Sequence, residues 1–320
     1  MQTYRIGIDV GGTNTKMMVM DAQDREMGRC VIKTEPEKGY EHACACMLQA
    51  VDALFERAGI TEKKVAGVAM GLPGMVDFEE QKTICLSVLG WDGFNPCEEI
   101  GRYYGAPCII DNDANVNALG EYVFGMNKKA RHMVLLTLGT GLGCGVIIEG
   151  KVFRGSENLS TELGHMTIVA DGGDTCLCGR PGHLEAYSSG TAMARHAQYI
   201  LPQYPDSALH GFIADNAGVY DNSMIEKGVR QGDAASTVIF RRFVRYLAIG
   251  VGNVMKLFNP ELVLIGGGIA NAGDILLDPL NAQVKEQVLH QRQCCPVRRA
   301  VLGDFAGMYG ACALAAECKT

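Results

Sequence analysis

One pattern occurs twice in the 320-residue chain and constrains its fold more than any other feature. Near the start, YRIGIDV is an apolar run rich in branched residues, GGTNT is a glycine turn, and KMMVMD is a second apolar run. Near the middle, HMVLLTLGTGLGCGVIIEGKVFRG repeats strand, Gly-Thr-Gly turn, strand, polar turn and short strand. Short apolar runs bounded by glycine turns are typical of buried β-strands. We therefore expect one β-hairpin unit to be duplicated in this chain.

Helical patterns alternate with the predicted strands. In HACACMLQAVDALFERAG, the apolar residues that share one helical face are Ala43, Met47, Ala50, Val51 and Leu54, and Gly59 supplies a stop signal. A second helix is expected over ASTVIFRRFVRYLAIGVGNVMKLF, which ends before Asn259 and Pro260, and ELVLIGGG then follows as a strand that enters a glycine turn. Alternating strands and helices predict the α/β class. The stretch from Gln198 to Asp221, with its prolines and mixed polarity, predicts no element.

Length, charge and cysteine content narrow the class of protein. A chain of 320 residues exceeds what one hydrophobic core usually supports, so we expect two domains with a cleft between them. The net charge of -7 argues against nucleic acid as the main partner, although a nucleotide is bound locally and is not excluded. No run approaches a membrane span, and the start of the chain lacks a secretory signal pattern. Thirteen cysteines scattered through apolar segments fit reduced thiols, so we expect a cytoplasmic protein.

The two glycine turns, DVGGTNTK and LGTGLGCG, are candidate phosphate-binding loops. Main-chain amides in such turns approach phosphate oxygens closely because no Cβ atoms intervene. The alternative is two tight hairpins whose glycines supply only positive φ, and for either loop alone that is the better interpretation. As a pair, each with Gly and Thr between two strands, the loops favour a polyphosphate. Neither contains a Walker sequence or GxGxxG, so a nicotinamide-binding enzyme is disfavoured.

Polar residues between and after these loops are candidates for catalysis and substrate binding. Asn112 and Asp113 follow an apolar run and precede a helical pattern, so either could cap that helix. A carboxylate at this junction, between two phosphate loops, is also where a phosphoryl-transfer enzyme needs a base. Glu162, His165 and Glu185 add the acceptors and donors that a polyhydroxylated substrate requires.

The stretch CLCGRPGH forms a candidate metal site with a histidine upstream. Cys176, Cys178, His183 and His165 make a possible Cys2His2 set for zinc. The alternative is that the cysteines are small buried apolar side chains and the histidines are ordinary polar residues.

Seven motifs together resemble the ROK family of sugar kinases. They are DVGGTNTK, GLPGMVD, NDANVNALGE, LGTGLGCGVI, ELGHMTI, the CLCG…LEAYSSG segment and VLIGGG, and they cover nearly the whole chain in the family's order and spacing. The resemblance is strongest to bacterial ROK glucokinases. It implies a two-lobed actin-like, ribonuclease-H-like ATPase fold with a duplicated βββαβα core. The smaller lobe would comprise residues 1–114 and a C-terminal helix at 305–320, and the larger lobe residues 115–304.

The same resemblance implies a role for each candidate residue. Asp113 would be the catalytic base, and the sugar would be held by Gly74, Asn112, Asp113, Glu162, His165 and Glu185. The residues around ATP and Mg²⁺ would be Asp9, Gly11, Gly12, Thr13, Asn14, Lys16, Gly139, Thr140, Gly141, Gly266, Gly267 and Gly268. Zn²⁺ would be structural, because four protein ligands leave no open position for substrate. A homodimer is expected.

The chain departs from the family's pattern at a few positions. His183 stands where the family usually has the last cysteine of Cys-x-Cys-Gly-x-x-Gly-Cys, which raises the net charge of zinc and its ligands from about -1 to about 0. Asn158 and Thr161 stand where many members have glycine, and Val88 replaces a frequent asparagine. These last changes bear on the identity of the sugar more than on the reaction.

We therefore expect ATP-dependent phosphorylation of a hexose, with glucose and its 6-hydroxyl as the first choice. One rival is a kinase for N-acetylmannosamine, N-acetylglucosamine, fructose or allose. Another is a ROK repressor that binds sugar without catalysis; it would need a helix-turn-helix before the first loop, and only eight residues precede Asp9.

Overall fold

The computed structural model describes residues 2–86 and 88–318. Contacts group them into two compact units. The first contains the described residues of Met1–Arg131, Gly145–Thr161 and Val301–Thr320, and the second contains His132–Cys144 and Glu162–Ala300. These bounds differ from the predicted lobes, which divide the chain at 114 and 304. The lobes remain a prediction, because compactness alone does not define which segments move together.

The first sheet contains the first copy of the repeated unit. Its strand order is β3-β2-β1-β4-β7, with bounds β1 (Tyr4–Val10), β2 (Asn14–Asp21), β3 (Glu26–Lys33), β4 (Val65–Leu72) and β7 (Cys108–Asn112). β1, β2 and β3 pair antiparallel, whereas β4 and β7 join parallel to β1. The predicted hairpin around GGTN is confirmed by the pairs Asp9 with Lys16 and Val10 with Thr15.

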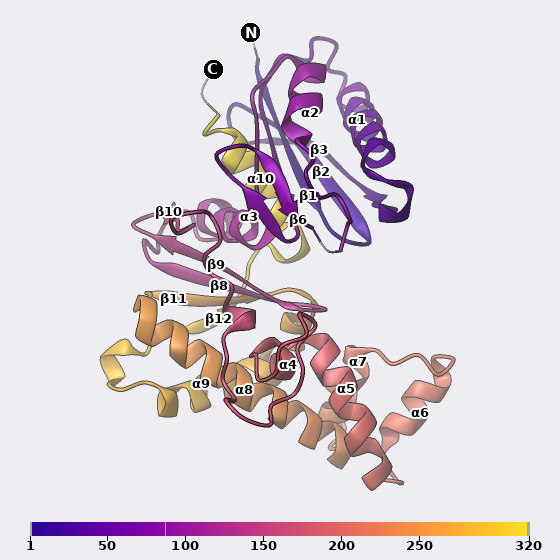
Figure 1. The fold of residues 1–320 in the computed structure, drawn as a ribbon, viewed down its shortest axis with the longest axis vertical. Helices are drawn as coiled ribbons and strands as arrows, with labels where there is room; N and C mark the ends of the chain where they lie inside the picture. The colour runs from indigo at the N-terminus through magenta and orange to yellow at the C-terminus, as the bar shows by residue number, and fades with distance from the viewer. Residues whose placement is uncertain (1, 87, 319–320) are drawn as a thin grey trace. The chain divides into compact units, whose positions relative to one another are not determined.

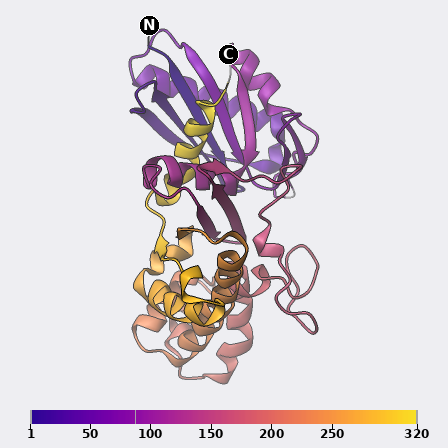
Figure 2. The same ribbon diagram turned by 90° about the vertical axis from the view of Figure 1, so that its left-hand side faces the viewer.

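Helices cover both faces of this sheet. On one face lie α1 (Tyr40–Arg57), which confirms the first predicted helix, and α2 (Pro96–Tyr104), with a core that includes Ile6, Ile8 and Phe55. On the other face lie α10 (Ala306–Ala315) and α3 (Asp113–Gly120) (Figures 1 and 2). Gly7 lets α10 approach closely, because a Cβ there would lie 2.5 Å from the Met308 carbonyl oxygen. A two-stranded ribbon, β5 (Met75–Asp77) and β6 (Lys82–Cys85), completes the strands of the first part of the chain.

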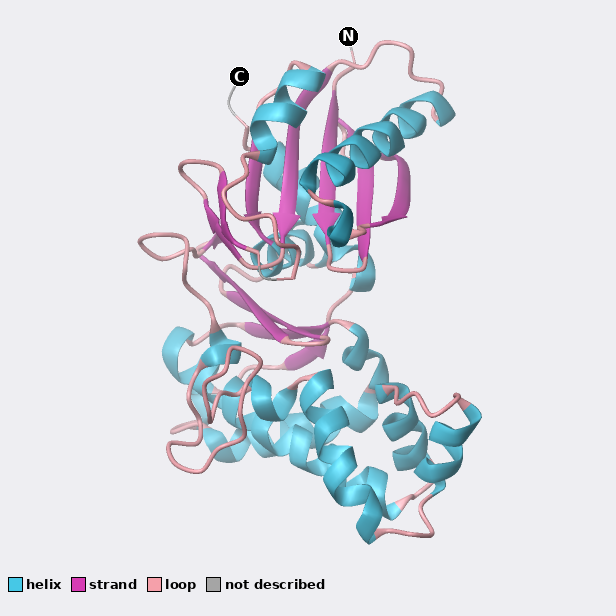
Figure 3. Ribbon diagram, turned by 45° about the vertical axis from the view of Figure 1, so that its right-hand side comes forward, coloured by secondary structure: helices cyan, strands magenta, loops and turns pink. Residues whose placement is uncertain are grey.

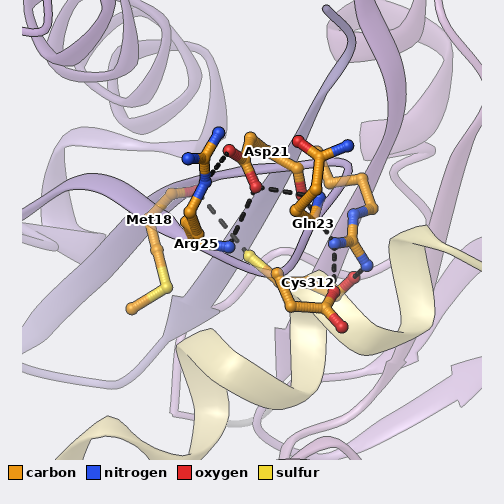
Figure 4. Close-up of polar contacts among 7 residues, drawn as sticks. Met18, Asp21, Gln23, Arg25 and Cys312 are labelled. Atoms are coloured by element: carbon orange, nitrogen blue, oxygen red, sulfur yellow. Dashed lines mark hydrogen bonds and ion pairs between the residues drawn. The ribbon is translucent and has the colours of Figure 1, made fainter.

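A buried carboxylate fixes the turn between β2 and β3. Asp21 accepts hydrogen bonds from the backbone N–H groups of Gln23 and Arg25, both at 2.9 Å, and from Arg25 Nε at 2.7 Å (Figure 4). Burial raises the pKa of Asp21, but these hydrogen bonds outweigh it and hold the pKa below its usual value. The turn at this end of β2 is therefore fixed, and Cys312 of α10 lies against Met18 of the same strand (Figure 4).

The second sheet repeats the first. Its order is β10-β9-β8-β11-β12, with bounds β8 (Met133–Leu138), β9 (Leu142–Ile148), β10 (Lys151–Val152), β11 (Leu262–Gly266) and β12 (Val297–Arg299). In each sheet, three strands consecutive in the chain form one edge and two later parallel strands extend the other. The shared order confirms the duplicated core and the α/β class.

The second unit is largely helical (Figure 3). Its α-helices are α4 (Glu185–Ser188), α5 (Gly190–Ile200), α6 (Ala208–Asp215), α7 (Asn222–Arg230), α8 (Ala234–Phe258) and α9 (Asp274–Gln287). The second predicted helix is confirmed as α8, which ends at Asn259 with φ 43°. No helix among residues 2–86 and 88–318 has the length and apolar character needed to cross a membrane.

Two further features complete the secondary structure. The stretch from Gln198 to Asp221 contains α6, which the sequence did not predict because this helix is short and only Leu209 in it is buried. Short helical turns are η1 (Pro36–Lys38), η3 (Leu163–His165), η4 (Leu201–Gln203), η5 (Gly268–Ala272), η6 (Gln291–Gln293), η7 (Gly303–Phe305) and the π-helix η2 (Glu121–Gly125).

Candidate active site

The first phosphate loop lies between β1 and β2 and is fastened by a neighbouring threonine. Gly11 donates its N–H to the Asn14 carbonyl at 3.0 Å. Thr34 donates its hydroxyl to the Gly11 carbonyl at 2.6 Å and its N–H to the Thr13 carbonyl at 3.1 Å. Thr34 is buried, and the sequence did not predict its role, because no local pattern connects it to Gly11, which lies 23 residues earlier. A fixed turn of this kind keeps backbone amides in place for an anion.

Asp9 and Lys16 lie opposite each other at the base of this loop. Lys16 Nζ lies 4.0 Å from Asp9 Oδ2 and donates to the Asp304 carbonyl at 2.9 Å. Gly307 in the first turn of α10 makes room for the carboxylate, because a Cβ there would lie 2.3 Å from Asp9 Cγ. Burial raises the pKa of Asp9 to about 6; Lys16 opposes this shift and Asp304 adds to it. An Mg²⁺ ion would favour the ionised form of such a group.

The end of β7 places Asn112 and Asp113 at the start of α3. Asn112 is the N-cap, and its side-chain oxygen accepts the N–H of Ala114 at 2.9 Å and of Asn115 at 3.3 Å. Its Nδ2 donates to the Gly74 carbonyl at 3.0 Å, which connects two predicted sugar-binding positions. Asp113 is the first residue of the helix and is half-buried. The sequence left the capping role open between the two residues; Asn112 is the N-cap, and Asp113 Oδ1 also accepts the Ala114 N–H at 2.9 Å.

Asp111 anchors this junction from beneath. It is 1% exposed and pairs with Arg154, whose Nε and Nη2 both lie 2.7 Å from Asp111 Oδ2. Its other oxygen accepts the Asn112 N–H at 2.7 Å and Asn115 Nδ2 at 3.0 Å. No local sequence pattern predicts this ion pair, because Arg154 lies 43 residues from Asp111. A paired and fully bonded buried carboxylate fixes the backbone on which Asp113 sits.

The second phosphate loop, in the second unit, is held by the start of α5. Gly190 donates its N–H to the Gly139 carbonyl at 2.8 Å, and Thr191 donates its hydroxyl to the Thr140 carbonyl at 2.9 Å. Within the loop, Gly139 donates to the Gly141 carbonyl at 3.1 Å. The predicted loop is thus a closed turn fixed to a helix N-terminus.

Glu185 connects this loop to the cysteine segment. Its Oε2 accepts the Leu142 N–H at 3.0 Å, and its Oε1 lies 3.2 Å from Cys176 Sγ as acceptor of the thiol. Gly141 cannot carry a side chain here, because its Cβ would lie 2.5 Å from Glu185 Oε2. The predicted sugar ligand Glu185 is therefore already part of a buried network.

Glu162 precedes the short helix η3 as its N-cap, and His165 is the last residue of that helix. His165 Nε2 lies 3.9 Å from Glu162 Oε2. Burial raises the pKa of Glu162; His165 opposes this shift, and Glu185 adds to it. Glu162, His165 and Glu185 belong to the second unit, whereas Gly74, Asn112 and Asp113 belong to the first.

The four predicted metal ligands come together. One ligand atom from each of His165, Cys176, Cys178 and His183 lies within 4.8 Å of all the others. Cys176 Sγ is 3.6 Å from His165 Nδ1, and Cys178 Sγ is 3.3 Å from His183 Nδ1. Ligand atoms of a tetrahedral zinc site are about 3.3–3.8 Å apart, given the usual bond lengths. Burial lowers the pKa of His183, as do His165 and Arg180, which keeps its imidazole in the neutral form that binds metals.

The third glycine turn follows β11. Gly266 ends this strand and Gly268 begins η5. Gly267 has φ 78°, and a Cβ there would lie 2.4 Å from the Leu138 carbonyl oxygen at the end of β8. Only glycine fits between these strand ends, so the backbone of the turn stays uncovered by side chains.

Comparison with known proteins decides the family. The family model of the ROK family matches residues 5–318. The chain belongs to the ROK family. A glucokinase of Halalkalibacterium halodurans is 30% identical over 96% of this chain and 93% of its own, and one of Streptomyces coelicolor is 32% identical over 98% and 97%. The crystal structure of a ROK family glucokinase from Streptomyces griseus in complex with glucose and AMPPNP matches with a TM-score of 0.83 and 30% identity, covering 98% of this chain and 100% of that one.

The departures from the ROK pattern have structural consequences. Asn158 and Thr161 have φ 57° and 70°, in the left-handed region that glycine adopts freely. A β-branched residue there is strained, so Thr161 makes the backbone before Glu162 less free to move. Val88 lies over the first phosphate loop, since a Cβ on Gly12 would lie 2.5 Å from Val88 Cγ1.

Proposed function

We propose that this ROK protein is an ATP-dependent glucokinase that phosphorylates the 6-hydroxyl of glucose. The observation that carries the proposal is the junction of β7 and α3, where Asn112 is the N-cap and the half-buried carboxylate of Asp113 is the first residue of the helix. The full-length similarity to glucokinases supports glucose as the sugar.

In this mechanism Asp113 accepts the proton of the sugar hydroxyl as the hydroxyl attacks the γ-phosphorus of ATP. Backbone amides in the loops at 11–13 and 139–141 would hold phosphate oxygens, and Asp9 would hold Mg²⁺, which would neutralise charge on the transferred group. Glu162, His165 and Glu185 bind sugar hydroxyls and orient the ring.

Zinc has a structural role in this proposal. The ligand spacing, the neutral His183 and the two thiols suit a tetrahedral Cys2His2 site. Bound zinc would fix the segment from His165 to Glu185 and no step of the reaction would pass through it. His165 would bind zinc through Nδ1, the nitrogen that faces Cys176, and offer Nε2 to the sugar.

A panel of sugars tests the proposed activity. A coupled assay with ATP and glucose, N-acetylmannosamine, N-acetylglucosamine, fructose or allose measures kcat/KM for each. We expect the highest value for glucose. A higher value for another sugar would replace glucose as the substrate, and no turnover with any of the sugars would favour a sugar sensor. The homodimer and the cytoplasmic location also remain predictions, and light scattering of the purified protein tests the first.

A further inference from the structure

The second unit contains a basic cavity that is separate from the candidate active site: none of the candidate active-site residues lines it. It lies between α5 and α8, which pack side by side (Figure 1), and its volume is about 430 Å³. Four of the seven lining residues are basic or imidazole side chains and none is acidic. The lining residues are His196, Ile200, Val238, Arg241, Arg242, Arg245 and Tyr246.

Two of the arginines have no counterion within the described residues. Arg241 and Arg245 are exposed, and neither has a hydrogen bond or ion pair with any residue in 2–86 or 88–318. They stand four residues apart, on the same side of α8, where like charges repel and weaken the helix. An anion between the two guanidinium groups would remove this repulsion, even though the chain as a whole carries a charge of -7.

Arg242, a third basic group of the cavity, is held in place, whereas His196 has an unsatisfied nitrogen. Arg242 donates to Asp174 Oδ2 at 2.9 Å, and its guanidinium carbon lies 5.3 Å from the centres of the Tyr187 and Tyr246 rings. His196 has a buried Nδ1 without a hydrogen-bond partner in the described part of the chain. Such buried polar atoms are rare in folded proteins and indicate a missing partner.

We propose that this cavity binds a small metabolite through a phosphate monoester group. Guanidinium groups bind phosphate oxygens in pairs, so Arg241 and Arg245 would hold the dianion from two sides. Ile200, Val238 and Tyr246 supply apolar surface for a short carbon skeleton. The volume lies in the range of small-molecule sites.

Arg242 connects this site to the proposed zinc segment. Its partner Asp174 accepts the Gly182 N–H through its carbonyl at 2.9 Å and donates its own N–H to the Tyr187 hydroxyl at 2.6 Å. A phosphate group that attracts the Arg242 guanidinium competes with the Asp174 carboxylate for that guanidinium. Loss of this ion pair loosens the segment from His165 to Glu185, which contains Asp174. Occupancy of the cavity therefore weakens sugar binding; this consequence rests on the proposed function.

Direct binding of glycerol 3-phosphate tests the site without sugar or nucleotide. Isothermal titration would compare the native protein, the double variant Arg241→Gln/Arg245→Gln, and the control Arg292→Gln/Arg298→Gln, which removes two exposed charges elsewhere in the second unit. We expect the native and control proteins to bind within about twofold of each other, and the cavity variant to bind at least ~10-fold more weakly. Absence of native binding up to about 10 mM, or equal weakening in the control, would overturn the site.

Two further measurements test which ligand the cavity prefers and whether its occupancy affects glucose binding. Inorganic phosphate should bind more weakly than glycerol 3-phosphate, and equal binding would refute the role of the apolar wall. Saturating glycerol 3-phosphate should weaken glucose binding at least ~5-fold in the native and control proteins, and not in the cavity variant. An unchanged glucose affinity would refute the coupling. Failure to bind glucose under any condition, with glycerol 3-phosphate still bound, would refute the proposed function and leave the site standing.

Discussion

Asp113 can serve as a base only as a carboxylate, because a protonated carboxyl group cannot accept the proton of the sugar hydroxyl. Asp113→Asn preserves the shape of the side chain but cannot accept a proton. We expect kcat to fall at least ~10²-fold, while the glucose dissociation constant changes little. A coupled assay and calorimetry measure the two quantities. Asp278→Asn, at an exposed position of α9, should leave both unchanged. Near-native turnover of the first variant would remove Asp113 from the mechanism.

Asp9 should make stability depend on pH, because burial raises its pKa from 3.8 to about 6. The folded protein then retains a proton that the unfolded chain loses, so this contribution to stability is complete below pH 3.8 and is lost as pH rises through about 6. Across that window the free energy of unfolding should fall by up to ~3 kcal/mol more in the native protein than in Asp9→Asn. Urea denaturation between pH 3.5 and about 7.5 measures the difference. Parallel pH curves for the two proteins would contradict the assignment.

At the scale of elements, the segment from His165 to Glu185 would depend on the proposed zinc. Between the end of η3 at His165 and the start of α4 at Glu185, the described residues form only isolated β-bridges, so bound zinc would replace regular secondary structure. Cys178→Ser should lose the one expected equivalent of zinc, because a hydroxyl is a poor ligand, and should lower both the melting temperature and the affinity for glucose. His183→Cys restores the usual ROK ligand and should retain the zinc.

Elemental analysis of protein purified without chelator checks this prediction, with ATP binding as the internal control. ATP affinity should be largely preserved in Cys178→Ser. A native protein that phosphorylates glucose but contains no zinc would show that the four side chains lie together without a metal.

Elements with strong periodicity could be predicted from the sequence, and weakly amphipathic ones could not. The hairpin GGTN, α1 and α8 each combine a long apolar pattern with a clear stop signal. α6 has eight residues, and its N-cap is Ser207. The Ser207 hydroxyl also donates a hydrogen bond of 3.0 Å to Asp233 Oδ2, and Asp233 is the N-cap of α8. A helix fixed by such distant contacts has little signal in its own residues.

The same distinction holds for the site. The spacing of CLCGRPGH with the upstream histidine predicted the four side chains that meet, because most of them lie on one short segment. The pair of Asp111 with Arg154 and the bond from Thr34 to Gly11 join residues that are far apart in sequence. No local pattern encodes them, and only the strand order brings them together.

At the scale of the whole chain, the C-terminal residues pack into the unit that the N-terminal residues form. Residues 301–318 belong to the first unit, where α10 packs against β1 and α3. Gly120 and Gly310 permit this packing, since a Cβ on Gly310 would lie 1.7 Å from the Val116 carbonyl oxygen. The last helix is therefore part of the first core, and loss of its attachment should destabilise residues far from it in sequence.

Glu121 is the attachment point that an experiment can test. Its carboxylate is fully buried and accepts the N–H of Val301 at 2.9 Å and of Leu302 at 2.7 Å, just before α10. Glu121→Gln keeps the volume but turns an NH₂ group toward one of these donors, so at least one charge-assisted bond is lost. We expect the free energy of unfolding to fall by ~2 kcal/mol and amide exchange in 301–315 to accelerate.

The matched control is Glu226→Gln, which removes only a helical pair with Arg230 and should cost about 0.5 kcal/mol or less. Urea denaturation and hydrogen exchange by mass spectrometry measure both variants. Because the control changes the same functional group on the surface, the difference between the variants isolates the buried anchor. Equal losses in the two variants, with unchanged exchange in 301–315, would show that packing of α10 alone holds the end of the chain in the first unit.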